Sequence, residues 1–143
     1  MFQEYGVQKK AFAGMKADSG DDRVESHLAG EDLPFGVFVA QDPTTGKIFI
    51  PKDGNTGTVL GVTVHSHGIT GDGYKKGDTV SVMVRGAIWV RADTTAQGKA
   101  NWAERIGQTA QVAHGTGEIS GLPGFHKGRI IDVEDGLVQI YLE

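Results

Sequence analysis

One stretch of the sequence, DTVSVMVRGAIWVRAD at residues 78–93, constrains the fold more than any other part of the chain. Apolar side chains alternate along it with polar or mixed ones, which is the period of a β-strand and not of a helix. The apolar face holds Val80, Val82, Val84, Ile88 and Val90, and the mixed face holds Ser81, Met83, Arg85, Trp89 and Arg91. Gly86 interrupts the apolar face, so we expect a bulge or a bend in the strand there.

The rest of the chain contains shorter stretches of the same kind, separated by turns. Gly accounts for 22 of the 143 residues, which is about twice its usual share. Further strands are predicted at 35–40, 47–51, 58–67 and 109–114, and a closing hairpin at 127–143 with the two-residue turn Asp135-Gly136. Residues 99–106 fit either a short helix or a loop. Short strands and Gly-rich turns predict an all-β domain, either a sandwich or a barrel.

Composition excludes several classes of function. The net charge of −4 gives no electrostatic reason to expect a nucleic-acid partner. No stretch approaches the roughly 20 consecutive apolar residues that a membrane span needs. The chain has no cysteine, which excludes disulfides, thiol nucleophiles and thiolate metal sites. The first ten residues lack the pattern of a secretory signal, so we expect the chain to be made in the cytosol and to stay there.

Residues 1–33 differ from the rest because they are polar and show no sustained period. We expect an extended N-terminal arm with one short strand near Val24, followed by a β domain over residues 34–143. A solvated, disordered tail is the alternative. The arm carries four apolar residues that could anchor it on a partner, namely Phe2, Tyr5, Phe12 and Met15. A segment that stays in solvent would hold fewer aromatic side chains.

The stretch VTVHSHGITGDGYKKGD, residues 62–78, contains a possible metal site. His65 and His67 resemble the His-x-His of deubiquitinase-type zinc peptidases, but Lys75 stands where that family needs a serine. A cupin-type site would need a third ligand such as His126. Metal binding requires three or four ligands that converge at ~2.0–2.2 Å. We therefore expect a strand end and a turn here, with no metal, no cofactor and no catalytic residue.

The mixed face of the strand at residues 78–93 suggests a contact surface. Trp, Met and Arg are the residue types that protein interfaces enrich. Met83, Trp89, Arg85 and Arg91 are accordingly candidate partner-binding residues. The alternative is that this face packs against a second sheet or under the arm. Under the interface hypothesis, Trp89→Ala weakens partner binding more than it lowers folding stability.

The order of several motifs resembles that of the structural cement proteins of tailed bacteriophages. The resemblance covers nearly the whole chain, from FAGMKAD through VESHLAGEDLPFGVFVAQD, VLGVTVHS and GYKKGDTVSVMVRGAIWVRAD to DGLVQIYLE. Its most specific pieces are PFG at 34–36, the Y-x-x-G-D-x-V-S-V turn and strand at 74–82, and G-x-I-W-V at 86–90. Residues 94–127 match only loosely.

The resemblance implies a jelly-roll-like β-sandwich that forms a small homo-oligomer, with a homodimer favoured over a trimer. It implies a protein of the virion that binds the outer capsid surface across major capsid protein subunits. There it would stabilise the mature head, without catalysis.

Two alternatives from other classes remain open. One is a small cupin-like metal-dependent enzyme with His65, His67 and His126 as ligands. The other is a glycan- or receptor-binding β-module on a phage surface, because fold alone does not determine function. Its candidate binding residues are Tyr74, Trp89, Trp102 and Phe125.

Overall fold

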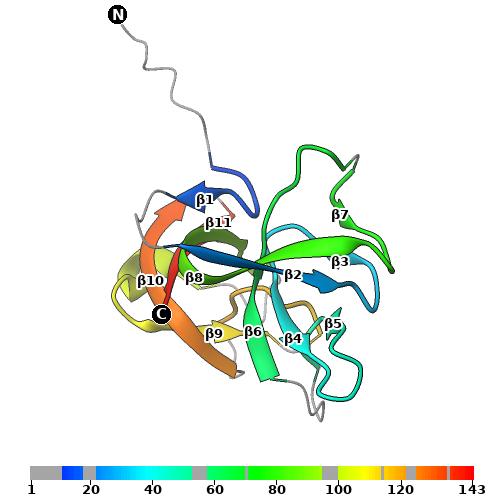
Figure 1. Cartoon of the computed structure of the whole chain (residues 1–143). Helices are drawn as coiled ribbons and strands as arrows, with labels where there is room; N and C mark the ends of the chain where they lie inside the picture. Colours follow the sequence, from blue (N-terminus) through cyan, green and yellow to red (C-terminus); the bar gives the residue numbers. More distant parts are fainter. Residues whose placement is uncertain are drawn as a thin grey trace, which may run out of the picture.

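The computed structural model describes residues 11–17, 22–52, 58–69, 71–94, 100–113, 115–121, 125–134 and 136–143. Within these ranges the chain forms eleven β-strands and one short 3-10 helix, η1 (Trp102–Arg105). The strands curl around one another into a compact body (Figure 1). Residues 99–106, for which the sequence left a helix or a loop open, thus contain one 3-10 turn. No helix in the described ranges is long and apolar enough to cross a membrane.

Strand β8 (Thr79–Arg91) organises the fold because two sheets share it. Its first half pairs with β2 (Arg23–Leu28) on one side and with β6 (Thr58–Thr63) on the other. Its second half pairs with β1 (Lys16–Ala17) and with β11 (Leu137–Leu142). Gly86, with φ of 110°, lies where the partners change. A strand that switches sheets needs such an irregular residue, and the sequence predicted one at this position.

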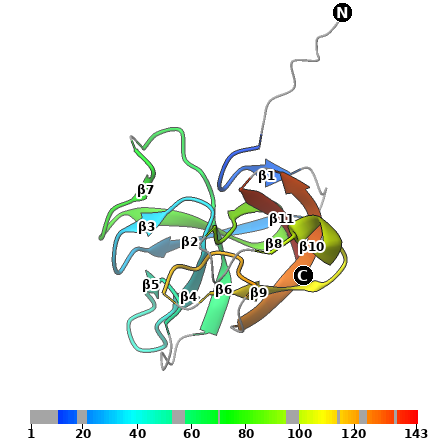
Figure 2. The ribbon, with the colours of Figure 1, turned by 180° about the vertical axis from the view of Figure 1, so that it is seen from behind.

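Each sheet continues away from β8 through antiparallel neighbours. The first sheet adds β4 (Phe38–Gln41) beside β6 and then β5 (Ile48–Phe49). The second adds β10 (Phe125–Glu134) beside β11 and then β9 (Thr109–Val112). The predicted closing hairpin is therefore confirmed by the pairing of β10 with β11, although Asp135 lies outside the described residues. The strands predicted at 35–40 and 47–51 pair with each other as β4 and β5. Seen from behind, β9 and β10 lie beside η1 (Figure 2).

The buried apolar side chains form two clusters. The first draws residues from both sheets, among them Phe38, Met83, Ile88 and Ile140. The second lies on the other face of the first sheet, under a ribbon of β3 (Leu33–Pro34) and β7 (Gly73–Tyr74). Val80 and Val82 belong to this second cluster, whereas Ile88 and Val90 belong to the first. The predicted single apolar face of β8 is thus divided between two cores, because the strand changes sheets at Gly86.

The all-β class predicted from the sequence is confirmed. The jelly-roll connectivity is not confirmed. The observed order is β5-β4-β6-β8-β11-β10-β9, with β1 and β2 along the other edge of β8. The described part of residues 1–33 thus contributes β1 and β2 to the two sheets.

Candidate functional site

The described N-terminal segment is fixed to the body by backbone hydrogen bonds. The N–H of Gly14 donates to the carbonyl of Trp89 at 2.8 Å, and the N–H of Trp89 donates to the carbonyl of Met15 at 3.0 Å. The N–H of His65 donates to the carbonyl of Gly14 at 3.0 Å. Gly14 has φ of 78°, and a Cβ there would lie 2.6 Å from the His65 nitrogen. Only glycine therefore fits at position 14, where the N-terminal segment passes close to the backbone of His65.

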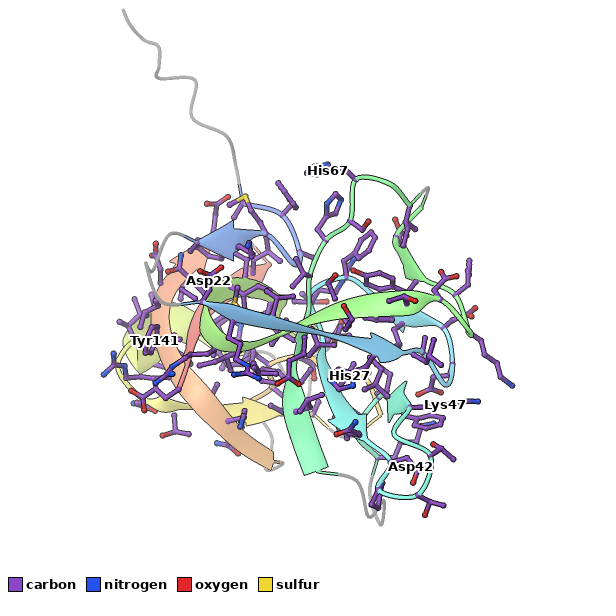
Figure 3. The ribbon with its side chains drawn as sticks, viewed as in Figure 1. Asp22, His27, Asp42, Lys47, His67 and Tyr141 are labelled. Atoms are coloured by element: carbon purple, nitrogen blue, oxygen red, sulfur yellow. The ribbon has the colours of Figure 1, made fainter. Side chains whose placement is uncertain are left out.

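Around this crossing, the His65 side chain lies between two phenylalanines. The ring centroid of Phe12 is 4.8 Å from that of His65, and the ring of Phe35 is 4.7 Å away on the body. The imidazole of His67 is 4.7 Å from that of His65. Side chains of Phe12, Met15, His65 and His67 line a hollow of about 250 Å³. His67 lies on the exposed loop after β6 (Figure 3).

The charged form of His65 is disfavoured in this environment. Its Nδ1 atom is buried and has no hydrogen-bond partner. Burial lowers the pKa of His65, and the nearby imidazole of His67 lowers it further. A proton on Nδ1 would have no acceptor, so the neutral ring is the form that fits.

The positions of His65 and His67 test the hypothesis of a metal site. They lie just beyond the last residue of β6, as expected of a strand end and a turn. Across the described residues, no three His, Asp or Glu side chains converge as metal ligands would. The side chain of His126 lies outside the described part of the chain. His65 and His67 alone supply two ligands, which is fewer than either metal template requires.

The mixed face of β8 is covered to different extents by the rest of the chain. Met83 has no exposed surface and Trp89 is only 6% exposed. Arg91 is half-buried, and its Nε donates to the carbonyl of Phe35 at 2.8 Å. Arg85 is exposed. Met83 and Trp89 therefore act as core residues in this chain, which leaves Arg85 as the exposed member of the set.

The arm candidates can be placed only in part. Phe2 and Tyr5 lie outside the described residues. Met15 is half-buried beside the histidine loop, and Phe12 is 38% exposed. Phe12 therefore contacts the body with one edge and leaves apolar surface open to a partner.

Strand β2 presents apolar surface that the sequence reasoning missed. Val24 is 40% exposed and Leu28 is 49% exposed, and both project from the same face because they are four residues apart in a strand. The alternation in RVESHL was the available signal. That alternation was hard to recognise because the residues on either side of the strand are polar.

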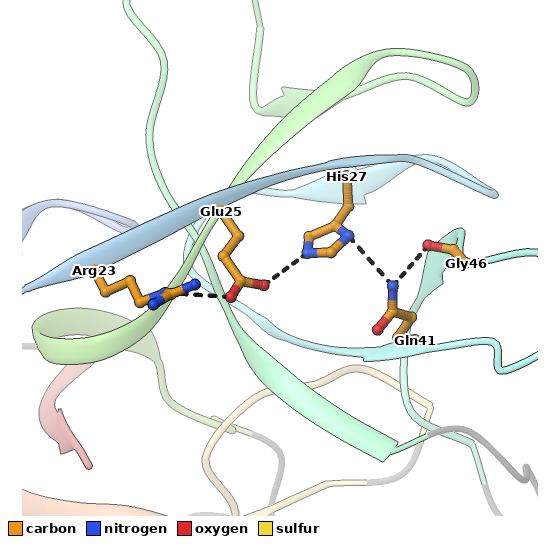
Figure 4. A network of polar contacts seen from close by, with 5 residues as sticks. All are labelled: Arg23, Glu25, His27, Gln41 and Gly46. Atoms are coloured by element: carbon orange, nitrogen blue, oxygen red, sulfur yellow. Dashed lines mark hydrogen bonds and ion pairs between the residues drawn. The ribbon is translucent and has the colours of Figure 1, made fainter.

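Strand β2 is also tied to the β4–β5 hairpin by a chain of polar contacts (Figure 4). His27 Nε2 lies 3.0 Å from Glu25 Oε1, and His27 Nδ1 lies 3.3 Å from Gln41 Nε2. Gln41 Nε2 also donates to the carbonyl of Gly46 at 3.1 Å. Arg23 Nε lies 3.4 Å from Glu25 Oε2 at the outer end. This network holds β2 in place along the seam of the first sheet.

The aromatic residues considered for glycan binding do not form a platform among the described residues. Tyr74 is 3% exposed and Trp89 is 6% exposed. Trp102 is half-buried on η1, where Arg105 lies 5.6 Å from its ring. The Phe125 side chain lies outside the described part. A sugar-stacking surface would need accessible aromatic faces.

Comparison with protein families identifies a match along nearly the whole chain. The family described as "Structural cement protein (E217 gp24/Pam3 gp6)" matches residues 2–143. No curated protein matches the chain.

Proposed function

The chain belongs to the structural cement protein family, and from this premise we propose that it binds the outer surface of a phage head. In this proposal it lies across neighbouring major capsid protein subunits, as a small homo-oligomer, and stabilises the mature shell without catalysis. The observation that carries the proposal is the extent of the match. Residues 2–143 include both the N-terminal segment and the β body, so the family match covers the arm and the body together.

Two physical features support the proposal. The body is held by two buried apolar clusters and can serve as a rigid support. The N-terminal segment is bonded to the body at Gly14 and is preceded there by thirteen residues, which include Phe2 and Tyr5. An arm that orders on binding exchanges chain entropy for a wide footprint. Weak contacts repeated over several capsid subunits then add by multivalency.

Within the proposed binding surface, Phe12 and Arg85 are the described candidates that remain exposed. Phe2, Tyr5 and Met15 complete the proposed set through the arm. Met83, Trp89 and Arg91 support the surface from within. The aromatic and Arg side chains in this set are types that dominate binding energy at interfaces.

The test is the copy number of this 15.2 kDa chain in purified virions, measured by quantitative mass spectrometry against the major capsid protein. A ratio near one to one, or a fixed simple fraction, is expected for a lattice decoration. A few copies per particle would indicate a tail or receptor-binding role, and absence from the particle would overturn the proposal.

A further inference from the structure

A hollow on the second sheet brings two positive charges together. It lies where β9, β10 and β11 are neighbours and has a volume of about 360 Å³. Lys127 and Arg129 of β10 line it, together with Thr109 of β9 and Tyr141 of β11. Arg129 pairs with Thr109 on one side and with Tyr141 on the other. Because residues directly opposite one another in a sheet share a face, these three side chains project together.

The backbone of β10 is irregular beside this hollow. The register of β10 against β9 shifts between His126 and Arg129, so the strand contains a bulge there. Gly128 has φ of 77°, and a Cβ at this position would collide with Cγ2 of the buried Ile140. A bulge turns side chains away from the directions they would have in a regular ladder. The bulge at Gly128 thus helps to bring Lys127 and Arg129 to one hollow.

Neither cation has a counterion in the part of the chain that the structure describes. The ion pairs there all involve other residues. The Cζ atom of Arg129 lies 6.0 Å from the centroid of the Tyr141 ring. An Arg that rests against an aromatic ring keeps its planar fork of N–H donors available to a partner. Arg129 is exposed and Lys127 is half-buried, so both can be reached from outside.

The hollow differs in sign from the molecule as a whole. The chain has a net charge of −4, but the described lining holds two cationic side chains against the single carboxylate of Glu143. Complementary charge on two surfaces steers their encounter and fixes their relative position. A surface of this sign therefore fits an acidic partner.

We propose that this hollow binds an acidic segment of the shell protein and places a carboxylate of that segment between Lys127 and Arg129. The inference rests on the proposed function for the identity of the partner. Arg can hold a carboxylate through two parallel N–H···O bonds, and Lys adds a compact charge. The hollow is near the small end of the roughly 300–1,000 Å³ that is usual for ligand sites. That size suits a few side chains of a partner segment.

Charge reversal tests the hollow against a matched position. Arg129→Glu should weaken binding to heads that lack this protein by about tenfold or more, because two carboxylates then face each other. Lys47→Glu makes the same change of charge at an exposed position on the far side of the body from Tyr141 (Figure 3), and should bind normally. Glu143→Gln removes the opposing carboxylate and should bind more tightly. All three variants should keep the circular-dichroism spectrum of the wild type.

Zero-length cross-linking identifies the group that enters the hollow. A carbodiimide joins a lysine amine to a carboxylate that touches it, with loss of water. On heads, Lys127 should form an amide with an Asp or Glu of the major capsid protein, which peptide mass spectrometry locates. Lys127→Arg keeps the positive charge but has no amine. It should therefore bind heads and give no cross-link from this position.

The outcomes separate this inference from the proposed function. Equal binding by the wild type and Arg129→Glu would overturn the inference alone. An equal loss in Lys47→Glu would assign the effect to net charge and overturn it as well, as would a cross-link from Lys127 only to another copy of this chain. Binding of duplex DNA that Arg129→Glu abolishes, with head binding unchanged, would assign the hollow to phosphate groups instead. A wild type that binds no heads would overturn the proposed function and this inference with it.

Discussion

The ring of Phe12 contacts the imidazole of His65 edge-on, with an interplanar angle of 66° and centroids 4.8 Å apart. Phe12 belongs to the N-terminal segment and His65 to the loop after β6, so this contact closes the root of the arm over the body. It also helps to shut solvent away from His65 Nδ1, which has no hydrogen-bond partner. The state of the arm and the titration of this histidine are therefore linked.

We expect the folded protein to lose stability as the pH falls below about 6.5, the ordinary pKa of histidine. The pKa of His65 is lowered by burial and by His67. Below pH 6.5 the unfolded chain takes up a proton that the folded chain resists, so the free energy of unfolding decreases with falling pH. The loss continues until the pH passes the lowered pKa. Tm measured at pH 7.5 and 5.5 should show a smaller drop in His65→Leu than in the wild type. An equal drop in both would refute the assignment to His65.

The close crossing at Gly14 predicts a large effect of a single methyl group. Gly14→Ala places a Cβ 2.6 Å from the backbone nitrogen of His65, at a φ of 78°. Gly77→Ala is the matched control, because Gly77 also has positive φ, at 91°, but open space around a Cβ. Both variants incur roughly 1–2 kcal/mol of backbone strain, and overpacking adds about 1–3 kcal/mol at Gly14 alone. Urea unfolding should therefore find Gly14→Ala the less stable of the two. An equal loss of stability in both variants would show that the N-terminal segment shifts to make room for the added methyl group at Gly14.

Trp89 tests whether the mixed face of β8 is core or contact surface. With Trp89 only 6% exposed, Trp89→Ala should destabilise the fold by about 3–5 kcal/mol, as a large cavity does. Trp102→Ala, at a half-buried site on η1, should cost less. Head binding measured well below the melting temperature should survive in Trp89→Ala. Normal stability together with lost binding would restore the interface hypothesis for this residue.

The limits of prediction from sequence are clearest in β8 and β2. Alternation located β8, and Gly86 predicted the point where the strand is irregular. The pattern could not show that the strand changes sheets there. A strand face that mixes apolar and polar residues, such as the face with Met83 and Trp89, has the same pattern whether it faces solvent or a second core. For β2, the local pattern predicted one short strand near Val24 but not its place beside β8. That pairing joins residues more than fifty positions apart, and local patterns carry no information at that separation.

Replacing Glu118 by glutamine is expected to raise the stability of the fold at neutral pH. Burial raises the pKa of Glu118 and the nearby Asp93 raises it further, while Arg91 opposes the shift. A raised pKa means that the folded chain binds the proton more tightly, so stability is lost as the pH rises from the ordinary value of 4.5 through the pKa in the fold. Glu118→Gln should thus raise Tm at pH 7.5 by more than at pH 4. Glu104→Gln, at an exposed position on η1, should change Tm little at either pH, and a similar gain there would point to net charge instead.

Variants of the N-terminal aromatic residues Phe2 and Tyr5 can test binding to heads separately from folding. If Phe2 and Tyr5 anchor the arm on the shell, the double variant Phe2→Ala, Tyr5→Ala should bind heads at least about tenfold more weakly, since anchors of this type each contribute on the order of 1–2 kcal/mol. If both residues anchor on the shell and not on the body, the Tm of this variant should stay near that of the wild type. Gln3→Ala, Gln8→Ala changes the same segment without removing an apolar anchor, and should bind normally. Co-sedimentation with heads that lack this protein measures all three. Equal binding by the two double variants would remove the aromatic anchors from the proposed mechanism, and a lowered Tm in the first would assign them to the body instead.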